Sequence, residues 1–301
     1  KRYAQMGRLI KKPNVWQKTI QRKFLNDSPV ARWTALVLIA LMMFFGYMFV
    51  DVMSPLKSLI ESARGWDSGT FGTYAASEYF LNVFVFFLIF AGIILDKMGI
   101  RFTGLLSASL MVIGASIKFV GISEWFQGTG LCAWLDSWWT SFPGSAKMAS
   151  LGFMIFGCGC EMAGTTVSKA IAKWFKGKEM ALAMGLEMAI ARLGVFAVMW
   201  LAPMISNHFD KSVVAPVAFC TVLLIVGLLC YTVFVYMDRR FDRQLIAAGS
   251  SRRRSPPTRS STSATSNTSS AARCSGSWRC SAYSTTRPSS PSSVMPPTSS
   301  R

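Results

Sequence analysis

The sequence predicts an all-α membrane protein with six transmembrane helices. Its residues are 51% hydrophobic and only 15% charged, a composition that is too apolar for a water-soluble domain. The apolar residues come in blocks of about 20, the length that a helix needs to cross a hydrocarbon core of about 30 Å. Because a bilayer offers no hydrogen-bond partner to an exposed backbone amide, these spans are expected to form helices that pack into a bundle.

Six apolar spans follow one another along the chain, separated by more polar loops. They run from Trp33 to Met53, Thr73 to Leu95, Phe102 to Gly121, Lys147 to Lys169, Met180 to Met204 and Val213 to Met237. From these boundaries we predict a basic cytoplasmic N-terminal segment at residues 1–32, a transmembrane bundle at residues 33–238 and a cytoplasmic exit at residues 239–250.

The basic residues of the short loops fall on one side of the predicted bundle. Residues 1–32 hold nine basic residues and one acid, Asp27. The loops on the same side contain Lys97, Arg101, Lys173, Lys176, Lys178, Arg239, Arg240 and Arg243. Because basic loops stay in the cytoplasm, we predict a cytoplasmic N-terminus. Residues 1–32 carry no acidic dileucine sorting signal, which favours a bacterial inner membrane over a lysosome.

The composition also excludes several classes of function. The formal net charge of +18 follows the sidedness of the loops and the basic C-terminal tail, so no nucleic-acid partner is predicted. The seven cysteines are scattered and support neither a disulfide framework nor a zinc site. The sequence contains no glycine-rich phosphate-binding loop followed by Lys and Ser or Thr, so an ATP-driven mechanism is not supported. We therefore expect no enzymatic activity, no cofactor and no metal. The expected partners are the lipid bilayer and a small-molecule substrate.

The composition changes abruptly at the C-terminal end of the chain. Residues 251–301 are rich in Ser, Thr, Arg and Pro, and such a segment cannot bury enough apolar surface to fold. One interpretation is a disordered basic tail. The favoured interpretation is a frameshift. If each codon of residues 265–301 is read together with the last base of the codon before it, synonymous codons exist that encode an apolar run of about 20 residues. That is the length of a seventh span.

A glycine-rich acidic and basic cluster lies between the second and third spans. It consists of Gly92, Asp96, Lys97, Gly99 and Arg101. Gly92 permits close helix approach and Gly99 permits a tight turn, and Asp96 at the membrane boundary can cap a helix N-terminus or pair with Arg101. The cluster resembles the signature of the major facilitator superfamily between its helices two and three. That resemblance implies a conformational latch, which holds the two halves of a transporter together when the cytoplasmic side is closed.

Three further segments resemble one branch of this superfamily, the one named for major facilitator superfamily domain-containing protein 1. They are residues 157–161, with two glycines and Glu161, residues 173–179, with Trp-Phe-Lys-Gly-Lys-Glu, and residues 191–194, with Ala-Arg-Leu-Gly. The resemblance extends from about Arg32 to Asp238. It implies the N-terminal bundle of a twelve-helix fold, with the C-terminal half of the transporter missing from the sequence.

Glu161 and Arg192 are the strongest candidates for substrate contact. Each is an ionisable residue inside an apolar span, where a charge costs about 2.5–3.5 kcal/mol, so such residues usually face a bundle interior and carry function. They lie on adjacent spans at matching depth. Glu161 is suited to bind an amine, and the fork of Arg192 to bind a carboxylate. The resemblance also places both on substrate-site positions; the alternative is a permanent ion pair that only fixes the helix register.

Three other acids are candidates for coupling transport to an ion. Asp51 lies near the end of the first span, Glu78 lies within the second, and Glu187 precedes Arg192 by five residues. Lys169 follows Glu161 at helical spacing and is expected to extend toward the membrane interface.

These observations favour a secondary active or facilitative transporter that works by alternating access. The relatives implied by the resemblance carry dipeptides, so small peptides or similar zwitterions are the expected substrates. Two alternatives remain open: an exchanger of organic anions or organophosphates anchored by Arg192, and a membrane scaffold without transport activity.

Overall fold

The computed structural model describes residues 25–254, and all the regular secondary structure within them is helical. The long helices are α2 (Pro29–Val50), α4 (Ser68–Phe84), α5 (Phe87–Ile122), α8 (Gly144–Trp174), α9 (Met180–His208) and α10 (Val214–Arg254). The short ones are η1 (Leu25–Asp27), η2 (Ser54–Leu56), α3 (Lys57–Arg64), α6 (Glu124–Gln127) and α7 (Gly130–Ser137). The predicted all-α membrane fold is confirmed.

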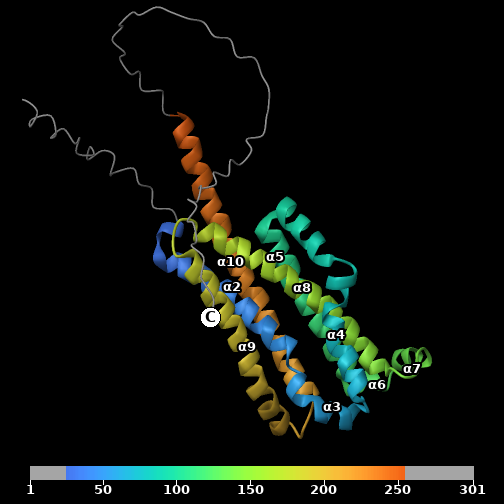
Figure 1. Ribbon diagram of the computed structural model, residues 1–301. Coiled ribbons are helices and arrows are strands. Elements are labelled where there is room, and N and C mark those ends of the chain that lie inside the picture. Colours follow the sequence, from blue (N-terminus) through green and yellow to red (C-terminus); the bar gives the residue numbers. More distant parts are fainter. Residues whose placement is uncertain (1–24, 255–301) are drawn as a thin grey trace, which may run out of the picture. The chain divides into compact units, whose positions relative to one another are not determined.

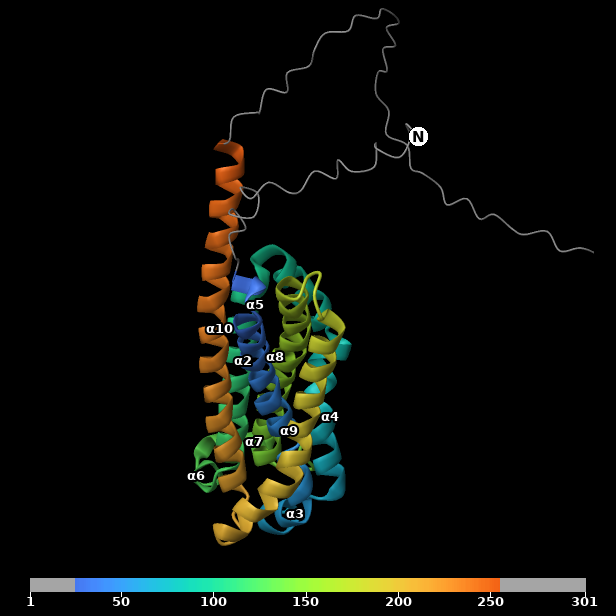
Figure 2. The same cartoon turned by 90° about the vertical axis from the view of Figure 1, so that its left-hand side faces the viewer.

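The long helices pack side by side into a bundle (Figure 1). α5 packs along α8, α2 lies between α9 and α10, α4 packs on α8, and α10 also contacts α5. The short helices α3, α6 and α7 gather at one end, and the C-terminal part of α10 extends beyond the other (Figure 2). We refer to these as the α3 end and the α10 end. The turn at Gly99 and the loop between α8 and α9 both lie at the α10 end. Among the described residues that were predicted to share one side, the following lie in or beside this turn, this loop and the C-terminal part of α10: Lys97, Arg101, Lys173, Lys176, Lys178, Arg239, Arg240 and Arg243.

The second predicted span, Thr73 to Leu95, is not one continuous helix. α4 ends at Phe84, and Phe86 has a left-handed backbone with φ of 53° before α5 begins at Phe87. For this reason five rather than six helical stretches of residues 25–254 are individually long and apolar enough to cross a membrane: Pro29–Arg64, Phe87–Ile122, Gly144–Trp174, Met180–His208 and Val214–Ala247. α4 and the first part of α5 together form the second of the six passages.

Gly99 makes the turn between the second and third passages. Its φ of 76° and ψ of 171° interrupt α5, and this backbone conformation is essentially restricted to glycine. The chain therefore reverses direction within one long helical element, and the tight turn predicted at Gly99 is confirmed.

Replacing Gly99 with alanine is expected to lower the free energy of unfolding by about 1–3 kcal/mol, because the side chain strains the backbone. A Cβ at Gly99 would meet no atom within 4 Å, so the cost arises from the backbone rather than from a clash. Gly92→Ala is the matched control: that position is helical and equally open, and alanine favours a helix. Thermal unfolding in detergent measures both. Equal melting temperatures for the two variants would contradict the assignment.

Two predicted regions reach beyond the described residues. Residues 1–24 of the basic N-terminal segment and residues 255–301 of the tail lie outside them, so the frameshift remains a prediction. The predicted cytoplasmic exit at residues 239–250 is helical, because α10 continues to Arg254.

Candidate functional site

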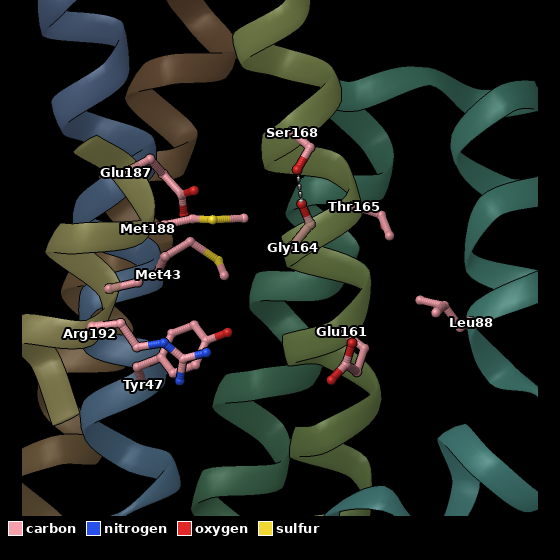
Figure 3. Close-up of a pocket in the computed structure, with 11 residues that line it drawn as sticks. Met43, Tyr47, Leu88, Glu161, Gly164, Thr165, Ser168, Glu187, Met188 and Arg192 are labelled. Atoms are coloured by element: carbon pink, nitrogen blue, oxygen red, sulfur yellow. Dashed lines mark hydrogen bonds between the residues drawn. The ribbon is translucent and has the colours of Figure 1, made fainter. Parts of the chain in front are cut away.

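Glu161 and Arg192 face a common space between α8 and α9 (Figure 3). Glu161 lies midway along α8 and Arg192 midway along α9. Both side chains are exposed to that space. Within the described residues, no ion pair shorter than 4.0 Å joins them. In this conformation, therefore, each charge is available to a ligand.

Arg192 is positioned by α2. Its guanidinium carbon lies 5.1 Å from the centre of the Tyr47 ring, a cation–π contact that orients the planar group. The close approach of α9 to α2 depends on Gly194, one half-turn further along α9, because a Cβ there would lie 2.4 Å from the carbonyl oxygen of Phe44. The Ala-Arg-Leu-Gly segment therefore supplies both the charge and the contact that holds it.

Two cavities meet at this charged pair, and Tyr47, Glu161 and Arg192 line both. The α10-side cavity has a volume of about 290 Å³ and is also lined by Thr165, Ser168 and Glu187. The α3-side cavity has a volume of about 390 Å³ and is also lined by Asp51, Ser54 and Glu78. The structure thus distributes the three candidate coupling acids over both sides of the pair.

Three of the five residues predicted to form a conformational latch, Asp96, Gly99 and Arg101, line a third cavity of about 550 Å³ at the α10 end. Asp96 does not pair with Arg101; its carboxylate accepts a hydrogen bond of 2.6 Å from Lys169. Arg101 instead pairs with Asp238 at 2.7 Å and with Asp242, both on α10. Gly92 is within the helix that leads to this cluster, and Lys97 is exposed.

Asp238 is the centre of that cluster and was missed by sequence reasoning. Its side chain is fully buried, and one carboxylate oxygen accepts from Lys173 at 2.7 Å and from the indole of Trp174 at 3.0 Å. The other oxygen accepts from Arg101. A signal was available: Asp238 is an acid directly before Arg239 and Arg240, at the end of an apolar span.

Lys118 is the second residue that sequence reasoning missed. Its side chain is completely buried in α5, and its ammonium group donates to the backbone carbonyl of Phe49, at 3.4 Å. Its position within the span from Phe102 to Gly121 was the signal, since an ionisable residue in an apolar span is a functional candidate by default.

Comparison with known proteins now adds to this geometry. A model of the Major Facilitator Superfamily matches residues 39–273. The mouse protein described as lysosomal dipeptide transporter MFSD1 is 26% identical over 224 residues, which cover 70% of this chain and 43% of the mouse protein. The proteins of the same name from Danio rerio and Homo sapiens are each 24% identical, over 71% of this chain and 44% and 43% of their own lengths.

The chain thus spans less than half the length of the curated relatives that it matches. The family model, in contrast, covers most of the chain, and the helical bundle that it implies is the one that the structure shows. The chain belongs to the major facilitator superfamily, a family of multi-pass membrane transporters.

Proposed function

We propose that this chain forms the N-terminal bundle of a secondary active or facilitative transporter for dipeptides or similar zwitterions. The observation that carries the proposal is the separation of Glu161 and Arg192 where two cavities meet. A carboxylate on one side and a guanidinium on the other match the amine and carboxylate of a small peptide. The names of the relatives, which are dipeptide transporters, support the same substrate class.

Alternating access gives the two cavities their roles. A site near the midplane is exposed first to one side and then to the other as two six-helix halves rock about it. Here the charged pair lines both cavities, so each cavity is proposed to be the approach to the site in one of the two states. The second half of the transporter, which supplies the opposite wall, is part of the proposal.

The α10 end is proposed to face the cytoplasm, because the basic loops gather there. We place the protein in a bacterial inner membrane as a multi-pass protein with a cytoplasmic N-terminus. The relatives named above are lysosomal, and in a lysosome the same end would also face the cytoplasm.

Uptake into vesicles that contain the full-length transporter tests this function. Dipeptides are expected to enter and to compete with one another, whereas single amino acids and sugar phosphates are expected to compete weakly. Uptake of sugar phosphates in preference to peptides would instead show an organophosphate exchanger. Absence of flux for every solute, with the protein folded, would support a scaffold and overturn the proposal.

A further inference from the structure

Lys118 places a charge in the buried interior of the bundle. Its ammonium nitrogen lies 4.3 Å from the ring centre of Phe49, 4.2 Å from that of Phe153 and 5.3 Å from that of Tyr74. These rings come from α2, α8 and α4. Among the described residues, no carboxylate oxygen lies within 4.0 Å of it. A buried ammonium without a close counter-ion costs several kcal/mol, of which cation–π contacts offset a part.

The carbonyl that Lys118 contacts belongs to the last turn of α2. That helix ends at Val50, so the carbonyl of Phe49 is one of the four that have no partner within the helix. The ammonium therefore lies at the negative end of the helix dipole, a position that favours a cation. α2 carries Tyr47 and is followed directly by Asp51; both line the α3-side cavity, so the contact ties Lys118 to the wall of that cavity.

Glu78 is the acid that completes this arrangement. It lines the α3-side cavity together with Tyr74 and Phe153, which are two of the three rings around the ammonium. Its exposed fraction is 7%, against 0% for Lys118. Glu78 is thus the member of the pair that is accessible from the α3-side cavity. The rings of Tyr74 and Phe153 line this cavity and also contact Lys118.

The fit of Glu78 depends on α8. A Cβ at Gly157 would lie 2.2 Å from the carbonyl oxygen of Glu78 and 2.9 Å from its Cγ. Only glycine at this position lets α4 bring the acid so close to α8.

Other charged and titratable groups surround the pair. Asp51 at the end of α2 and Glu161 of α8 line the same cavity as Glu78, and Cys220 of α10 is a further titratable group near Lys118. Tyr74 has a buried hydroxyl without a hydrogen-bond partner among the described residues. Arg192 lines the same cavity from α9. Among the acids that line the α3-side cavity, Glu78 is the most buried, because Asp51 and Glu161 are more exposed.

We propose that Glu78 is the proton-binding site of the transporter and that Lys118 is its fixed counter-charge. A proton that arrives through the α3-side cavity adds to a carboxylate oxygen of Glu78, and no other bond changes. Glu78 is then neutral, and the ammonium is held by the carbonyl of Phe49 and the three rings alone. This inference rests on the proposed transport function, for which it names the proton as the coupling ion.

Proton binding is linked to the cavity by packing. The two states of Glu78 differ by one charge at a largely buried position, and an uncompensated charge there is costly. The charged state favours close approach of α4 to α5, whereas the neutral state removes that attraction and leaves Lys118 held by the carbonyl of Phe49 and the three rings. Glu78 and the end of α2 both line the α3-side cavity, so the proton changes the balance between two arrangements of its wall.

Infrared difference spectroscopy tests the site without any substrate. The protein in lipid bilayers is moved from alkaline to acidic buffer, and the carbonyl stretch of a carboxyl group in an apolar environment is recorded. That band is expected to appear in the parent, to be absent in Glu78→Gln, and to change frequency in Glu78→Asp. Asp51→Asn and Glu161→Gln, which remove other acids of the same cavity, are expected to keep it. A full band in Glu78→Gln, or loss of the band in Asp51→Asn, would overturn the proposal.

Lys118→Met tests the role of the counter-charge in the same experiment. Without the ammonium, Glu78 has no partner for its charge and is expected to remain protonated in both buffers, so the acid-induced change disappears. Circular dichroism and the melting temperature report whether the variant is folded. An unchanged acid-induced band in folded Lys118→Met would show that the lysine is a structural residue only.

Coupling is measured with a pH indicator trapped in vesicles that contain the full-length transporter. Entry of a dipeptide is expected to acidify the lumen of parent vesicles, whereas Glu78→Gln is expected to admit the dipeptide without acidification. If no dipeptide enters parent vesicles, the proposed substrate is wrong, and the infrared band still decides whether Glu78 binds the proton. Dipeptide entry without acidification in the parent would overturn the coupling.

Discussion

Arg192→Ala is expected to reduce dipeptide uptake at low substrate concentration by about 10- to 150-fold. Truncation removes the guanidinium that binds the substrate carboxylate, and hydrogen bonds to charged groups contribute about 1.5–3 kcal/mol. The comparison with Arg192→Lys separates charge from geometry, because lysine keeps the charge but not the planar fork. Uptake of a radiolabelled dipeptide into vesicles measures the effect. Arg240→Ala is the control, since that exposed arginine contacts only Tyr236 of its own helix among the described residues.

A dipeptide with an amidated C-terminus distinguishes substrate contact from a structural role. In the parent, amidation is expected to weaken competition about as much as Arg192→Ala weakens uptake, because both remove one partner of the same interaction. In Arg192→Ala, the free and the amidated peptide are expected to compete equally. If the variant still prefers the free carboxylate, another residue binds that group, and Arg192 serves to pack against Tyr47.

The same design applies to Glu161. N-acetylation removes the positive charge of the peptide amine, and Glu161→Gln removes its proposed partner while keeping the shape of the side chain. The two losses are expected not to add, as is typical of changes at one contact. Additive losses would place the amine elsewhere in the two cavities.

The positions of the spans could be predicted because the bilayer sets them. The length of an apolar block determines where a helix crosses, so the spans predicted at Lys147–Lys169 and Met180–Met204 both lie within observed helices. Gly99 was predictable for a different reason: a glycine beside charged residues between two spans indicates a turn, and its φ of 76° confirms it.

The break at Phe86 could not be predicted in this way. The residues around it are almost all apolar, so hydropathy continues without interruption from Phe84 to Phe90. An aromatic residue rarely adopts a left-handed backbone, and no local sequence pattern predicts the break at Phe86. The residues from Val83 to Phe86 are exposed, so contacts within the described bundle do not explain the break either.

The site was partly predictable because charge in an apolar span is a local signal. Glu161 and Arg192 carry that signal, and the structure brings them to the same two cavities. Lys118 carries it too, but its position near the predicted end of a span fits a lysine that extends to the interface. Its actual environment consists of the end of α2 and rings from three helices. Contacts between helices that are far apart in the sequence cannot be predicted from the hydropathy of one segment.

Asp238→Asn is expected to lower the free energy of unfolding by about 3 kcal/mol, the lower end of the range for breaking a buried ion pair. Asp238 is fully buried, whereas Arg101 and Lys173 are each about one-third exposed, and partial hydration of these cations moderates the loss. One oxygen accepts from Lys173 and Trp174 and the other from Arg101. An amide keeps one of those oxygens but presents N–H groups to a donor at the other position.

Asp242→Asn is the matched control, because Asp242 pairs with the same two cations from the next turn of α10 but keeps one-third of its side chain exposed. Its loss is expected to cost about 1 kcal/mol or less, as is usual for ion pairs that water can reach. Thermal unfolding in detergent measures both variants. A larger effect of Asp242 would show that the exposed acid holds the Gly99 turn to α10. If Asp238→Asn has the larger effect, the cluster between the second and third passages is anchored mainly to α10 of its own bundle. A latch to the other half of the transporter must then act through other residues of the cluster, such as the exposed Lys97.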